Sequence, residues 1–113
     1  MAILIKKYEK IIIELLKEYA VMFNQQGDGL EAKVIIDKDN GHFQLLNNGW
    51  YRGDYQFYVI FHFEIKNNKV WLLENRTDIL IAKELTERGV PKLDIVLGLQ
   101  EPEVSAELGY AIA

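Results

Sequence analysis

The chain contains no cysteine, two histidines, two prolines and a single serine among its 113 residues. The lack of cysteine excludes disulfides, thiolate zinc sites and a cysteine nucleophile, and it fits a reducing compartment. No apolar run approaches the ~20 residues that a membrane helix needs. No small-residue cleavage site follows the apolar start of the chain. We therefore expect a cytoplasmic protein without a membrane partner.

Positive charge is also scarce, because 13 Lys and Arg residues face 17 Asp and Glu residues, for a net charge of −4. Tight binding to nucleic acid by counterion release needs several clustered cations. The lysines near the N-terminus, Lys6, Lys7 and Lys10, are interrupted by Glu9. We therefore expect no tight binding of DNA by this chain alone.

Hydrophobic residues make up 50% of the chain, which is enough for one core. At this length the expected organisation is a single domain, residues 1–113. Apolar residues recur at helical spacing from Leu4 to Phe23, which predicts a long N-terminal helix. This apolar stripe is wide enough for two neighbours. A sheet on one side and a second copy of the chain on the other would cover it, so a homodimer is expected.

Two turn signals organise the middle of the chain. A two-residue turn at Asn40-Gly41 would pair Ile36 with Leu45, and one at Asn67-Asn68 would pair Ile65 with Val70. Thr77 is the predicted N-cap of a second helix, which Gly89 and Pro91 would end. The predicted fold is α+β: an antiparallel meander sheet of four or more strands, packed by the long N-terminal helix and a second helix near residues 77–88.

The strand over residues 55–65 alternates clearly. Its odd residues are expected to face the helix, and they include Phe57, Val59, Phe61 and Phe63. The other face would carry Tyr58, Ile60, Trp71 and Leu73, and it is apolar enough to favour burial against a second copy.

Candidate chemistry is sparse. His62 and Glu64 share a strand face with Tyr58, which makes Tyr58, His62 and Glu64 a weak candidate polar site. Such pairs are more often surface contacts. His42 lacks the further ligands that a metal would need. We therefore predict no catalytic residue, no metal and no cofactor.

Trp50, Tyr51 and Arg52 form an aromatic and basic cluster between the predicted hairpins. Trp, Tyr and Arg dominate the residues that anchor protein interfaces, so these three are the candidate partner contact. The alternative is that Trp50 covers the core.

Several segments together resemble the XisI family of small cyanobacterial proteins, named for control of fdxN element excision. They are residues 42–50 (HFQLLNNGW), 62–66 (HFEIK), 69–71 (KVW), Thr77 with residues 81–82 and 84–85, and residues 89–98 (GVPKLDIVLG). In the family the segment after Gly98 runs through a histidine and a proline to a basic residue. This chain departs from that pattern, because it has no Lys or Arg beyond Lys92.

The resemblance implies a controlling factor in site-specific DNA excision that acts through protein contact with an XisH-like protein, and not as the recombinase. No catalytic residue is carried over from the family. Two other readings stay open. One is an inhibitor or antitoxin-like subunit of a nuclease-type partner, with an acidic surface that mimics nucleic acid. The other is a small enzyme with a site formed between subunits.

Overall fold

The computed structural model of the chain describes residues 2–112. Met1 and Ala113, the ends of the predicted 1–113 domain, lie outside the described residues. The elements in chain order are α1 (Ala2–Asn24), β1 (Leu30–Asp37), β2 (His42–Tyr51), β3 (Asp54–Lys66), β4 (Lys69–Asn75), α2 (Ile81–Glu87), the short 3-10 helix η1 (Lys92–Asp94), β5 (Ile95–Leu97) and α3 (Pro102–Glu107).

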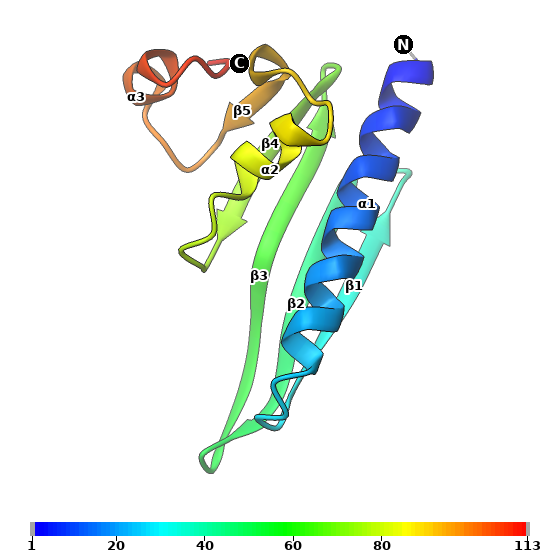
Figure 1. Cartoon of the computed structure of the whole chain (residues 1–113), viewed down its shortest axis with the longest axis vertical. Helices are drawn as coiled ribbons and strands as arrows, with labels where there is room; N and C mark the ends of the chain where they lie inside the picture. The colour runs from blue at the N-terminus through cyan, green and yellow to red at the C-terminus, as the bar shows by residue number, and fades with distance from the viewer. Residues whose placement is uncertain (1, 113) are drawn as a thin grey trace.

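The predicted α+β fold is confirmed. The five strands form one sheet in the order β1-β2-β3-β4-β5, in which β1 to β4 are an antiparallel meander and β5 runs parallel to β4. The long helix α1 lies across one face of this sheet, and α2 lies on the same side over β4 (Figure 1). None of the helices within residues 2–112 is long and apolar enough to cross a membrane.

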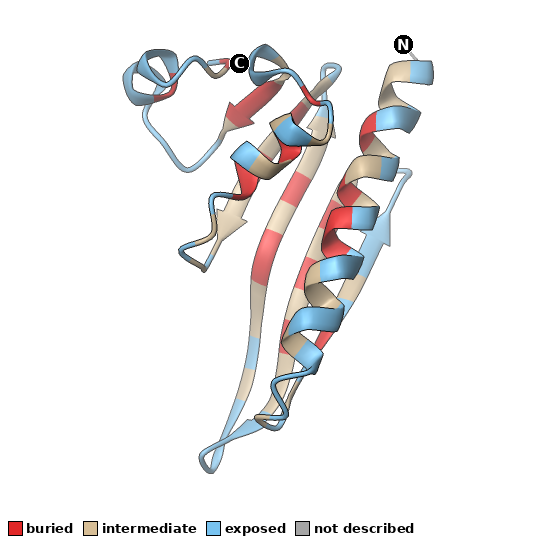
Figure 2. Cartoon of the chain, viewed as in Figure 1, coloured by how far each residue is buried: buried red, intermediate tan, exposed pale blue. Residues whose placement is uncertain are grey.

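The core lies between α1 and the sheet, as Figure 2 shows in red. The helix buries Tyr8, Ile12, Leu15 and Leu16, four residues at the 3- and 4-residue spacing of one helix face. The strands contribute fully buried aromatic and aliphatic side chains, among them Phe43, Leu45, Phe61, Phe63 and Val70.

The second neighbour of α1 is found within the same chain. Tyr19 donates a hydrogen bond to Glu84 of α2 at 2.5 Å, and Arg88 donates two hydrogen bonds to Glu18 at 2.8 and 2.9 Å. Tyr8 also donates to Asp94. The wide apolar stripe of α1 is therefore no argument for a second copy of the chain, since α2 and the segment after it occupy the second side.

The prediction that all odd residues of β3 face the helix is wrong for its first half. The β2–β3 register jumps from Leu45↔Phe61 to Leu46↔Val59, so Ile60 is an extra residue in a β-bulge. One extra residue exchanges the two faces of a strand. Ile60 is therefore buried at 4% exposure and Phe57 is 64% exposed.

This bulge also removes the predicted apolar face of Tyr58, Ile60, Trp71 and Leu73. Tyr58 and Ile60 belong to the core side, whereas Trp71 pairs with Glu64 on the opposite side. A second irregularity between His62 and Phe63 sets Glu74, and not Leu73, opposite His62. The homodimer thus stays a prediction, and neither of the two reasons given for it from the sequence survives.

The two predicted turns have different outcomes. The Asn67-Asn68 turn is confirmed, with both residues at positive φ (55° and 62°) and with Ile65 opposite Val70. The Asn40-Gly41 turn is longer than predicted, because Asp37 accepts hydrogen bonds from the backbone and side-chain nitrogens of Asn40 at 3.1 and 2.7 Å.

The longer first turn moves the strand register. Ile36 lies opposite Phe43, two residues from the predicted partner Leu45. A shift of two residues keeps every side chain on its face, so Ile36 and Leu45 still share a face although the predicted pair is wrong.

The second helix begins later than predicted. Its N-cap is Leu80, without a side-chain cap, and the hydroxyl of Thr77 instead accepts a hydrogen bond from the backbone of Ile79 at 3.0 Å. The predicted end is confirmed. Gly89 has φ 113°, and the backbone of Val90 donates to Leu85 at 3.0 Å, as in a Schellman motif.

Candidate functional site

The face of the sheet opposite α1, here called the open face, carries three of the residues singled out from the sequence: Trp50, His62 and Glu64. Strand alternation and register assign its side chains. They are Lys33 and Ile35 of β1; His42, Gln44, Leu46 and Trp50 of β2; Tyr55, Phe57, Val59, His62 and Glu64 of β3; and Trp71 of β4. In Figure 1 both α1 and α2 lie on the other side of the sheet, and α3 lies beyond β5.

One end of the open face is a hairpin tip that extends past the C-terminal end of α1 (Figure 1). The predicted loop around Trp50, Tyr51 and Arg52 is in fact continuous strand, because Trp50 pairs with Tyr55 and Tyr51 with Asp54. Only Arg52 and Gly53 remain as the turn, both at positive φ (51° and 86°). This is the geometry of a tight two-residue hairpin turn.

Five side chains form what we call the aromatic tip: Trp50, Tyr51, Arg52, Tyr55 and Phe57. Trp50 is 65% exposed, so it does not cover the core. Its ring meets that of Tyr55 edge to face at 5.6 Å between centroids, and the guanidinium of Arg52 lies 5.3 Å from the centre of the Tyr51 ring. These contacts hold large side chains in place at a tip whose residues are exposed and coloured pale blue in Figure 2.

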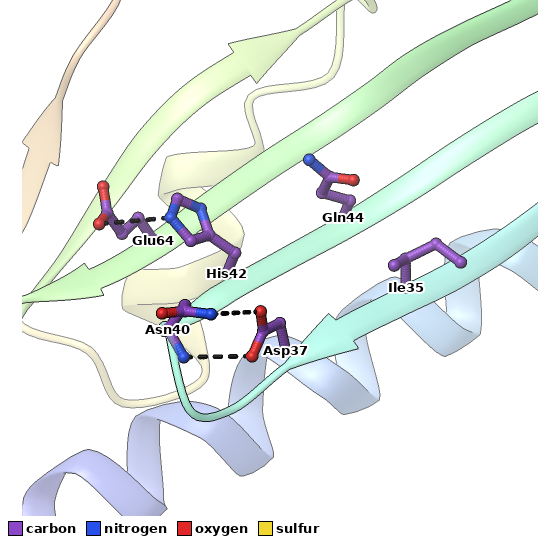
Figure 3. A pocket seen from close by; sticks show the side chains of 6 residues that line it. All are labelled: Ile35, Asp37, Asn40, His42, Gln44 and Glu64. Carbon is purple, nitrogen blue, oxygen red and sulfur yellow. Dashed lines mark hydrogen bonds and ion pairs between the residues drawn. The ribbon is translucent and has the colours of Figure 1, made fainter.

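The other end of the open face holds a polar network, here called the histidine network: His42, Gln44, His62 and Glu64. Nδ1 of His42 lies 2.8 Å from Nε2 of His62, Nε2 of Gln44 lies 3.5 Å from Nδ1 of His62, and Nε2 of His42 lies 3.5 Å from the Glu64 carboxylate. Figure 3 shows His42 and Glu64 facing each other beside Gln44, with Asp37 and Asn40 at the turn.

Two neutral imidazoles satisfy this network with one arrangement of protons. Gln44 donates to Nδ1 of His62, Nε2–H of His62 donates to Nδ1 of His42, and Nε2–H of His42 donates to Glu64. Burial, and then the neighbouring His42, lower the pKa of His62, although Glu64 and Glu74 oppose this. This direction favours an uncharged His62 ring.

The structure brings His62 and Glu64 together with His42 and separates them from Tyr58. The Tyr58 hydroxyl accepts a hydrogen bond from Asn47 at 3.1 Å, on the helix side of the sheet. Across residues 2–112, no three His, Asp or Glu side chains are placed to hold a metal ion. His42 and Gln44 were not predicted as partners of His62. The signal that could have found these two residues is the pairing of β2 with β3, which sets His42 opposite Glu64 and Gln44 opposite His62.

The fold and the open face together define a small α+β protein. Its exposed aromatic side chains, among the described residues, gather at one hairpin tip. Comparison with known proteins then identifies the family of the chain. The model of the XisI protein family matches residues 1–112, so the chain belongs to the XisI family. Comparison with curated proteins found no match.

Two solved structures are similar over nearly the whole chain, and both come from Anabaena variabilis ATCC 29413. One is a XisI-like protein with 38% sequence identity and a TM-score of 0.84. The other is fdxN element excision controlling factor XisI, with 29% identity and a TM-score of 0.81. Each comparison covers 97% of this chain and 99% of the other.

Proposed function

We propose that this chain is a controlling factor for the excision of a DNA element, and that it acts by binding another protein through the aromatic tip. The exposure of the tip carries the proposal. Trp50 at 65%, Tyr55 at 55% and Phe57 at 64% present contiguous aromatic surface to solvent. Membership of the XisI family and the similarity to a structure named as an excision controlling factor support the biological role.

Burial of these rings by a partner would be favourable for physical reasons. Each aromatic side chain offers a large apolar area with few rotatable bonds, and Arg52 beside Tyr51 offers donors for a carboxylate. Residues of these types supply most of the binding energy at protein interfaces. The expected partner is an XisH-like protein with an apolar pocket and acidic residues at its rim.

Direct action on DNA has little support from charge. The net charge is −4, and Arg52 is the only cation in the aromatic tip. A few phosphate contacts give weak, salt-sensitive binding. Control of excision is therefore proposed to pass through the partner, with the chain itself neither a nuclease nor a recombinase.

The test is a calorimetric titration of an XisH-like protein with this chain and with a Trp50→Ala, Arg52→Ala double variant. Loss of two anchors should weaken binding by about tenfold or more, with an unchanged melting temperature. The matched control is Lys83→Ala with Leu93→Ala, which removes one exposed cation and one exposed apolar side chain (70% exposed for Leu93) away from the tip. This control should bind as the parent does.

A second titration uses labelled duplex DNA at physiological salt, with and without the XisH-like protein. We expect no submicromolar binding by this chain alone. Such binding would contradict action through a protein partner, and so would a stably folded double variant that binds the partner as tightly as the parent.

A further inference from the structure

Among the described residues, β1 is an edge strand that pairs only with β2. We propose that two copies of this chain join through antiparallel pairing of their β1 strands, which makes one continuous sheet across the dimer. This inference is independent of the proposed function, because it uses the segment from Lys33 to Asp37 and not the aromatic tip.

β1 is an edge strand of 8 residues, longer than the usual 5 or 6, and it contains no proline. Its pairing with β2 runs from Leu30 to Asp37 without a bulge. Within residues 2–112 it pairs with no other strand, whereas at the opposite edge of the sheet Val96 of β5 bridges Ala111. In Figure 1, β1 runs along the margin of the sheet, and α1 runs beside it on the side of β2.

The side chain of Asn24 reveals which backbone groups point outward from the edge. Its amide oxygen accepts from the N–H of Ala32 at 2.7 Å, and its amide nitrogen donates to the C=O of Ala32 at 3.0 Å. The backbone groups of Ala32 therefore point away from β2. Alternation directs those of Val34 and Ile36 the same way. Asn24 thus closes the edge at Ala32, and the stretch from Val34 to Ile36 stays available.

The side chains of β1 select one register. When Val34 pairs with Ile36 of a second copy, Ile35 lies opposite Ile35, and Lys33 lies opposite Asp37 on both sides of the two-fold axis. The exposed Ile35 (45%) and Ile36 (38%) become cross-strand contacts. Lys33 already meets Glu31 at 3.0 Å, but both side chains are more than half exposed, so Lys33 remains able to reach Asp37 of the other copy.

Neighbouring registers are less favourable. Pairing Val34 with Val34 sets Asp37 opposite Glu31, two like charges, and Lys33 opposite Ile35. Pairing Ile36 with Ile36 sets Ile35 opposite Asp37. A central lysine also discourages pairing with an unrelated strand. Charge therefore favours a second copy as the occupant, and it favours the single register in which both lysines meet aspartates.

The experiment measures molar mass by light scattering from about 1 to 200 μM, and the parent should approach twice its 13.1 kDa at the higher concentrations. Lys33→Asp sets two aspartates opposite each other, and Asp37→Lys sets two lysines opposite each other. Each variant alone should weaken dimerisation by about tenfold or more. A mixture of the two should recover it, because each strand then meets its opposite charge. Lys83→Asp on α2 is the matched control and should dimerise as the parent does.

Amide hydrogen exchange on the unmodified chain gives a second readout that does not depend on any variant. The amide of Ala32 should be protected at every concentration, because Asn24 holds it within one chain. The amides of Val34 and Ile36 should gain protection only where the dimer forms. The proposal is overturned by a 13.1 kDa species throughout, by fast exchange at Val34 and Ile36 at all concentrations, or by a dimer that Lys33→Asp leaves intact.

Discussion

Two phenylalanines of β3, Phe57 and Phe61, offer a matched test of how the bulge at Ile60 divides the strand. Both have odd numbers, so a regular strand would put them on one face. Instead Phe61 is fully buried, with its ring 5.6 Å from that of Tyr19 and 6.5 Å from that of Phe63, whereas Phe57 is 64% exposed.

The expected magnitudes differ clearly. Phe61→Ala removes a fully buried ring and leaves a cavity, at a cost of about 3–5 kcal/mol in the free energy of unfolding. In Phe57→Ala only the buried part of the side chain, about a third of its surface, is lost, at a cost of about 1 kcal/mol at most. A domain of this size has about 5–15 kcal/mol in total, so Phe61→Ala removes a large part of its stability.

Urea unfolding followed by far-UV circular dichroism measures both variants with the same assay and the same type of substitution. The midpoint should fall strongly for Phe61→Ala and little for Phe57→Ala, with similar slopes. Equal losses for the two variants would refute the bulge and restore the regular alternation expected from the sequence.

Three further changes test other parts of the structure. Asn24→Ala should lower stability by about 1 kcal/mol, because the backbone groups of Ala32 lose their partner, and urea unfolding should show the loss. Burial and the Glu84 hydrogen bond raise the pKa of Tyr19 to about 12, so its contribution to stability is full below pH 10 and lost as the pH rises through 12. Tyr19→Phe should flatten that part of a melting-temperature profile. The pKa of His62 is lowered instead, so its contribution is present above about pH 6.5 and lost as the pH falls, and His62→Gln should reduce the fall in melting temperature between pH 7 and 5.

Local signals were sufficient for much of the fold. The Asn67-Asn68 turn was predicted with its register, because two asparagines tolerate the positive φ of a tight turn. Gly89 marked the end of α2 for a similar reason. The bulge at Ile60 left no such signal. It depends on the burial of two adjacent side chains, Ile60 and Phe61, on the same side of the sheet, and that is a property of tertiary packing.

The candidate site was predictable only in part. Trp50, Tyr51 and Arg52 were recognised by residue type, but Arg52-Gly53 is an unusual turn pair, so the tip was taken for a loop between hairpins. Because the tip was taken for a loop, the direct pairing of β2 with β3 was not predicted, and neither was the histidine network. His42 and His62 are 20 residues apart, and their contact follows only when β2 and β3 are known to pair directly.

The bulge also explains how one strand serves both the core and the open face. On a regular β3, Tyr58 and Ile60 would leave the core and Phe57 would replace them beneath the C-terminal end of α1. With the extra residue, two adjacent apolar side chains, Ile60 and Phe61, are both buried, and Phe57 is released to the aromatic tip. Exposure of a phenylalanine gives no stability to an isolated chain. Its position at the tip, next to the Trp50 and Tyr55 pair, is what the proposed partner contact would account for, and the Trp50→Ala, Arg52→Ala titration tests that surface.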